Sequence, residues 1–144
     1  MCDHIHILSH IEQFRWIGIC EHDKVHLSWD HLILFLNPSE LNKLGAVLDV
    51  AITEDKRFKQ HRYALENEDQ HWSVPEKGHF DIWIGHYALR LAPVDYLLFG
   101  SMVSKALSSF PAHIAVSPIA MKVEEKIERG VELSAKPDIK FSVN

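Results

Sequence analysis

The chain has 144 residues, a formal net charge of −5 at pH 7 and two cysteines, and 47% of its residues are hydrophobic. This length and composition favour one globular domain with a buried core, the acidic balance argues against a nucleic-acid partner, and two cysteines are too few for a disulfide framework. Because the apolar runs are shorter than the ~20 residues of a membrane span and the N-terminus lacks the features of a secretory signal, we expect no membrane insertion and a cytoplasmic location.

The first 22 residues contain two apolar segments, HIHIL and QFRWIGI, which we interpret as strands around a turn near residues 9–12. They also contain two Cys-x-His pairs, Cys2 with His4 and Cys20 with His22. A hairpin with this turn would bring the two cysteines opposite each other. Because thiolate and imidazole are donors that zinc prefers, these four residues are a candidate metal site with zinc as the cofactor.

Two alternatives to a zinc site stay open at these residues. Structural zinc sites usually place two to four residues between paired ligands, whereas only one residue separates the members of each pair here. The residues would then be unrelated thiols and surface histidines. A disulfide between Cys2 and Cys20 is the other alternative, and a reducing compartment disfavours it.

Residues 25–36 predict a β-hairpin with a two-residue turn at Asp30 and His31. In this register every pair on one face is apolar, as a half-buried hairpin requires. The pairs are Trp29 with Leu32, Leu27 with Leu34, and Val25 with Leu36.

A helix is predicted to follow this hairpin over residues 38–53. Asn37 is a suitable N-cap, Pro38 suits the first helical position, and Glu40 lies three residues after the cap. The buried stripe of this helix contains Gly45, and a glycine inside a helix costs about 1 kcal/mol relative to alanine. We therefore expect the helix to lie very close to the sheet or to a second helix.

Residues 54–78 form a charged connector, and we expect its first half to extend the helix to about residue 65. A second hairpin is predicted to turn at Gly85 and His86, with Asp81 opposite Arg90. A second helix is predicted to begin at Pro93, with Ala92 as a weaker cap. Further on, we predict a C-terminal helix over residues 117–129 and a tail that adds one or two edge strands.

The two hairpin–helix segments, residues 25–53 and 80–108, align without a gap at a spacing of 55 positions. We therefore predict an α+β fold of internally duplicated β-hairpin–helix units, related by a pseudo-two-fold axis, with antiparallel sheet packed on helices. The two hairpins share one sheet or form two small sheets. Because the shared positions serve packing, functional residues are expected where the copies differ or outside the repeat.

The predicted outer face of the hairpins is unusually apolar, which indicates an interface. Its residues are Ile33, Phe35, Trp83 and Arg90. No phosphate loop, nucleophile elbow or metalloprotease motif is found in the sequence. We therefore expect a non-catalytic module that binds a protein partner or itself through the sheet, with a zinc-binding or small-ligand-binding protein as the alternative.

A third hypothesis is a histidine-based enzyme with its site in a cleft between the repeats. His31 and His86 occupy equivalent turn positions and would be related by the pseudo-dyad. The simpler explanation is conformational, because histidine tolerates the positive φ that we expect at the second turn position better than most residues do.

Overall fold

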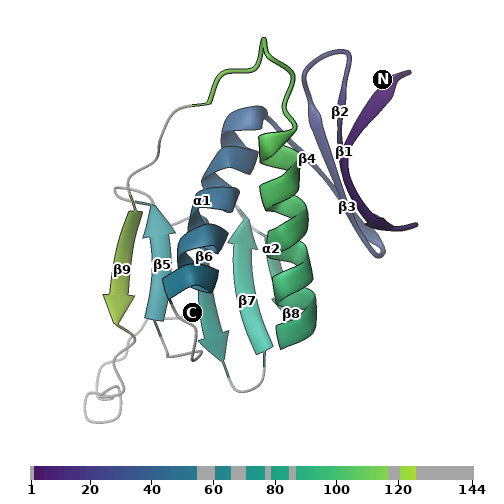
Figure 1. The fold of residues 1–144 in the computed structure, drawn as a ribbon. Coiled ribbons are helices and arrows are strands. Elements are labelled where there is room, and N and C mark those ends of the chain that lie inside the picture. Colours follow the sequence, from purple (N-terminus) through teal and green to yellow (C-terminus); the bar gives the residue numbers. More distant parts are fainter. Residues whose placement is uncertain are drawn as a thin grey trace.

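The computed structural model describes residues 2–54, 61–65, 71–76, 79–84, 87–116 and 121–125. The fold is α+β, with antiparallel sheets and two helices (Figure 1). A four-stranded first sheet has the order β1-β2-β3-β4, and a five-stranded second sheet has the order β8-β7-β6-β5-β9. The elements are β1 (Ile5–Glu12), β2 (Arg15–Cys20), β3 (Val25–Trp29), β4 (Leu32–Leu36), α1 (Pro38–Glu54), β5 (His61–Leu65), β6 (His71–Glu76), β7 (His79–Ile84), β8 (Tyr87–Leu91), α2 (Pro93–Ser108) and β9 (Met121–Glu125).

Both predicted hairpin registers are confirmed. In β3 and β4, Val25 pairs with Leu36 and Trp29 with Leu32, and the equivalent pairs are present in β7 and β8. Asp81 accepts hydrogen bonds from Arg90 across the second hairpin, at 2.9 Å from its Nε. The hairpins lie in separate sheets, so the second of the two predicted arrangements is correct.

The predicted helix starts are also confirmed. Asn37 and Glu40 form a reciprocal capping box, in which each backbone N–H donates to the other side chain at 2.8 Å. Ala92 precedes Pro93 at the start of α2 and provides no side-chain cap.

The two helices pack against each other through their glycines. A methyl group on Gly45 would collide with Cδ1 of Leu107, and one on Gly100 would collide with Cδ1 of Ile52. The predicted close approach is therefore between the helices rather than to a sheet. Because Gly45 meets the end of α2 and Gly100 meets the end of α1, the helices are antiparallel (Figure 1).

Each helix packs mainly on the sheet of the other half of the chain. α1 contacts β5 and β6, whereas α2 contacts β1 and β2. The Trp29 and Phe99 rings meet edge to face at 5.1 Å, which joins α2 to the first sheet. Phe80 stacks on Tyr96 at 3.9 Å and joins α2 to the second sheet. Because each helix packs on the sheet of the other half, the apolar core is continuous between the two halves.

Three predicted segments differ from the structure. α1 ends at Glu54, and the predicted connector contains β5 and β6 rather than an extension of the helix. Met121–Glu125, inside the predicted C-terminal helix, is strand β9 and pairs with β5, whose edge would otherwise be open. The first turn follows Glu12 instead of lying within residues 9–12, because Cys20 pairs with Ile5 and not with Cys2, and two register shifts in β1 place further residues before the turn. The tail, residues 126–144, lies outside the described residues.

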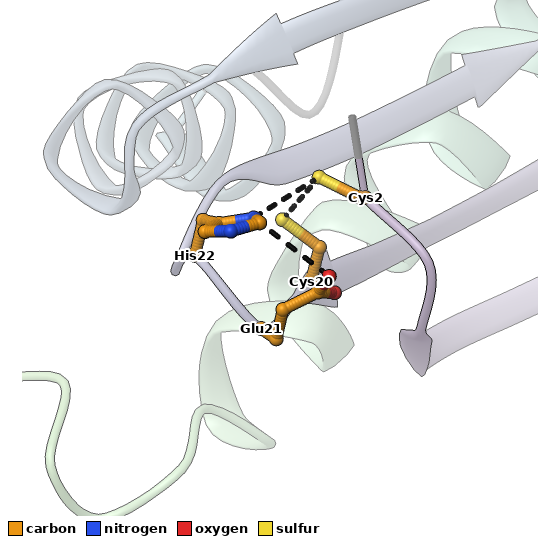
Figure 2. A group of neighbouring side chains, drawn as sticks. All are labelled: Cys2, Cys20, Glu21 and His22. Atoms are coloured by element: carbon orange, nitrogen blue, oxygen red, sulfur yellow. Dashed lines mark hydrogen bonds and ion pairs between the residues drawn. The ribbon is translucent and has the colours of Figure 1, made fainter.

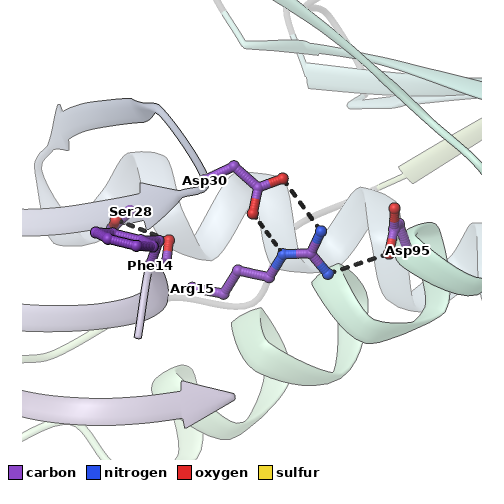
Figure 3. A network of polar contacts seen from close by, with 5 residues as sticks. All are labelled: Phe14, Arg15, Ser28, Asp30 and Asp95. Atoms are coloured by element: carbon purple, nitrogen blue, oxygen red, sulfur yellow. Dashed lines mark hydrogen bonds and ion pairs between the residues drawn. The ribbon is translucent and has the colours of Figure 1, made fainter. Parts of the chain in front are cut away.

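Arg15 fastens the first sheet to the start of α2 (Figure 3). Its guanidinium donates to both carboxylate oxygens of Asp30, at 2.7 and 3.1 Å, and to Asp95 at 3.1 Å. It also lies 4.1 Å from the centre of the Trp29 ring, a cation–π contact. This arginine, whose side chain is 14% exposed, lowers the pKa of Asp30 and fixes the orientation of α2.

Among the described residues, neither helix combines the length with the apolar character that a transmembrane segment requires.

Candidate metal centre

A tight turn after β2 holds three potential ligands close together. Cys20 is the last residue of β2, and Glu21 and His22 follow it directly. Within the turn, the Cys20 N–H donates to Lys24 O at 3.0 Å, and the Asp23 N–H donates to Cys20 O at 2.9 Å. Asp23 has a φ of 57°, a conformation that aspartate adopts more readily than most residues. The turn is therefore closed by backbone hydrogen bonds on both sides of the ligands.

The Glu21 carboxylate brings the N-terminal segment to this turn. It accepts hydrogen bonds from the backbone N–H groups of Asp3, at 2.9 Å, and His4, at 3.1 Å. These bonds, led by the one from Asp3, lower the pKa of Glu21 to about 2. The carboxylate is therefore ionised at neutral pH, and it places Cys2 beside Cys20.

Four side chains converge at this point (Figure 2). The Sγ atoms of Cys2 and Cys20 are 2.7 Å apart, and Cys2 Sγ lies 3.8 Å from His22 Nδ1. The same nitrogen lies 3.8 Å from Glu21 Oε2. One ligand atom from each of the four residues falls within 4.8 Å of all the others. The group therefore offers two sulfurs, one nitrogen and one oxygen.

This group overlaps the sequence-predicted metal site but differs in one member. Cys2, Cys20 and His22 come together as predicted, whereas His4 contributes its backbone N–H and its side chain is exposed outside the group. Glu21 occupies the fourth place. The sequence hinted at Glu21 through its position between two other ligands, in the run Cys-Glu-His. Spacing alone does not show that the Glu21 side chain turns toward the N-terminal segment.

The two thiols differ strongly in acidity. The hydrogen bond to Cys20, together with desolvation, raises the pKa of Cys2 to about 11. Desolvation also acts to raise the pKa of Cys20, but hydrogen bonds from Cys2, the His22 and Lys24 backbones and the His26 ring lower it to about 6. The hydrogen bond between the two sulfurs therefore favours a proton on Cys2 and the negative charge on Cys20.

His26 lies directly behind Cys20 on the outer face of the first sheet. Its side chain is buried and meets the Phe35 ring edge to face at 4.9 Å. Its Nε2 is buried and has no hydrogen-bond partner among the described residues. The interaction of His26 with the Cys20 sulfur helps to lower the pKa of this thiol.

The donor set suits a tetrahedral zinc ion. With Zn–S bonds of about 2.3 Å, two sulfurs in such a site lie about 3.8 Å apart, and a sulfur and an imidazole nitrogen are slightly closer. The separation of Cys2 from His22 is already near this value, while the two sulfurs would have to separate by about 1 Å. Because Cys2 lies outside the strands, this movement requires no change in a sheet.

The predicted interface residues do not lie in one sheet. Ile33 and Phe35 are 53% and 63% exposed on β4 of the first sheet. Trp83 is half-buried and Arg90 is exposed, and both lie in the second sheet. The four residues therefore belong to two separate surfaces, because the hairpins do not share a sheet.

His31 is exposed in the turn between β3 and β4, and the positive φ in this turn belongs to Asp30, at 55°. The conformational explanation offered for His31 is therefore wrong. His86 lies outside the described residues, so a cleft between the two histidines stays a prediction.

Comparison with known proteins found no matching family model, no matching curated protein and no matching solved structure.

Proposed function

We propose that this protein binds one zinc ion through Cys2, Cys20, Glu21 and His22. The observation that carries the proposal is the convergence of their four ligand atoms within 4.8 Å. Four protein ligands leave no open coordination position, which is typical of structural rather than catalytic zinc. The ion would clamp the N-terminal segment to the turn between β2 and β3.

The chemistry of the donors favours zinc over the common hard cations. Thiolate and imidazole ligands suit zinc, whereas calcium and magnesium take oxygen ligands almost exclusively. One sulfur is already ionised at neutral pH, because the pKa of Cys20 is lowered to about 6. The carboxylate of Glu21 is ionised as well. Of the two sulfurs, only that of Cys2 would therefore have to lose a proton when zinc binds.

The test is the metal content of protein purified without a histidine tag and kept reduced. After loading with zinc and dialysis, elemental analysis should find one zinc per chain. Cobalt substitution should add a thiolate-to-cobalt absorption band that weakens in Cys2→Ser and disappears when both cysteines are replaced by serine. A zinc content far below one per chain, or a cobalt spectrum without the thiolate band, would rule out the proposed site.

We also infer that the two halves of the chain arose by duplication and are related by a pseudo-two-fold axis, as the repeat predicts. It is supported by the common order of four strands and a helix in each half. The helix contacts are reciprocal, since Gly45 meets Leu107 while their repeat equivalents, Gly100 and Ile52, meet each other. The metal-binding turn has no cysteine at the matching position, which is Pro75. The site therefore belongs to one half only, as expected for a function added to a duplicated scaffold.

We also propose that a second copy of the chain docks on the first sheet. β4 is an edge strand of that sheet, and its sequence, LILFL, carries no charge and exposes Ile33 and Phe35. The opposite edge, β1, is interrupted by two register shifts, which discourage pairing. Antiparallel pairing of two β4 strands would extend the sheet across a two-fold axis and place Ile33 and Phe35 beside the same residues of the second copy.

The expected result is a dimer of the wild-type protein in solution and a monomer when β4 carries charge. Ile33→Lys with Phe35→Lys places two charges on the exposed face of the edge strand, which blocks pairing. Val94→Lys is the matched control, because Val94 is 69% exposed and lies on α2 instead of on the edge strand β4. Light scattering after size exclusion gives the masses. A monomeric wild type, or equal effects of both sets of variants, would contradict the interface.

A further inference from the structure

The chain places its only two cysteines in direct contact. Cys2 Sγ and Cys20 Sγ are 2.7 Å apart although the residues are 18 positions apart in the sequence. Cys2 is half-buried and Cys20 is buried at the end of β2. The Glu21 carboxylate, which accepts from the N–H groups of Asp3 and His4, maintains this contact. The pair is therefore held together by the fold and not by the metal alone.

We propose that Cys2 and Cys20 are an oxidisable dithiol, which a hydroperoxide converts to an intramolecular disulfide. The oxidation is independent of the proposed zinc function. A consequence that does rest on that function is release of the ion, because disulfide sulfurs are no longer thiolate ligands. The same two atoms would then hold zinc when reduced and close the hairpin of β1 and β2 covalently when oxidised.

The reaction proceeds in two balanced steps. In the first, one sulfur attacks a peroxide oxygen, so an S–O bond forms, the O–O bond breaks, and the displaced oxygen leaves with a proton as water or alcohol. In the second, the other sulfur attacks the sulfenic sulfur, so the S–S bond forms, the S–O bond breaks, and hydroxide leaves with the second thiol proton as water. The two thiols lose two electrons, and these reduce one hydroperoxide.

The contact between the sulfurs decides the course of this oxidation. Whichever sulfur meets the peroxide first, its partner is already within reach, so the sulfenic acid is consumed inside the same chain. Such an intramolecular step outcompetes reaction with a second molecule. It also prevents further oxidation to the sulfinic acid, which is essentially irreversible.

The test treats reduced, metal-free protein with one equivalent of hydrogen peroxide. We expect both thiols to disappear together, the mass to fall by two hydrogen atoms, and the product to stay monomeric at every protein concentration. Cys2→Ser and Cys20→Ser should instead stop at a sulfenic acid, which dimedone traps as an adduct. Disulfide-linked dimers, sulfinic acid in the wild-type protein, or dimedone trapping equal to that of the single variants would overturn the proposal.

A second arm separates this proposal from the zinc function. His22→Gln removes a zinc ligand and keeps both thiols, so it should bind zinc about 100-fold more weakly and still form the disulfide at the wild-type rate. In zinc-loaded wild type, a chromophoric chelator should detect one zinc released per disulfide formed. Disulfide formation in a protein that never binds zinc would refute only the metal function. Stoichiometric zinc binding without disulfide formation would refute only the dithiol.

Discussion

Replacing Cys20 with serine is expected to weaken zinc binding by about 100-fold. Structural zinc in small domains contributes roughly 12 kcal/mol, so the loss of one of four ligands removes about 3 kcal/mol. Serine nearly preserves the size of the buried side chain but supplies no thiolate. Competition with a chromophoric chelator at fixed pH measures the change in affinity.

His4→Gln is the matched control for this ligand set. His4 has the same spacing from Cys2 as His22 has from Cys20, but only its backbone N–H takes part, in a hydrogen bond to Glu21. This variant should therefore bind zinc as the wild type does, whereas His22→Gln should not. Equal losses in His4→Gln and His22→Gln would contradict the arrangement in Figure 2 and restore the set predicted from spacing.

The same site predicts that zinc binding weakens as pH falls. The pKa of Cys2 is raised to about 11, so its thiol still carries a proton at neutral pH and has to lose it to the solvent when the metal binds. Calorimetry in buffers of different ionisation enthalpy should detect this proton release in the wild type. Cys2→Ser removes that proton, so its binding should release less.

The largest expected effect on stability is that of Phe99→Ala, which should lower the free energy of unfolding by about 4 kcal/mol. Phe99 has no exposed surface, and its ring meets Trp29 edge to face. The substitution leaves a cavity between α2 and the first sheet, at the junction where the helix crosses to the other half of the chain. Urea unfolding followed by circular dichroism measures the loss.

The neighbouring residue on the same helix provides the control. Leu98 is 36% exposed, so Leu98→Ala should cost well under half as much as the change at Phe99. Similar losses at both positions would mean that α2 is not oriented as in Figure 1. If the slope of the unfolding free energy against urea concentration is the same in both variants and the wild type, the denatured state is unaffected. The difference in stability between the two variants then arises in the folded protein.

Local features of the fold could be predicted from the sequence because short-range rules govern them. The register of β3 and β4 follows from the alternation of apolar residues, since a shift by one residue would turn Leu27 toward solvent. The start of α1 follows from the capping box of Asn37 and Glu40. The close approach of the helices follows from Gly45, because a glycine inside a helix otherwise only destabilises it.

The candidate site could be predicted only in part. The proximity of Cys2 and Cys20 was foreseen, but its predicted cause was wrong. The hairpin pairs Cys20 with Ile5, and Cys2 reaches Cys20 through the N-terminal segment that Glu21 holds at the turn. The role of Glu21 was missed, because its choice of backbone partners depends on how the N-terminal segment crosses the turn.

Local sequence patterns specify the hairpin registers, the helix starts and the paired thiols and histidines near the N-terminus. Long-range packing is what divides the hairpins between two sheets, pairs each helix with the opposite half and makes Met121–Glu125 a strand. The ion pair of Arg15 with Asp95, 80 positions apart, belongs with these. The physical reason is that strand edges and apolar helix faces accept several partners, and which one they take depends on burial over the whole chain.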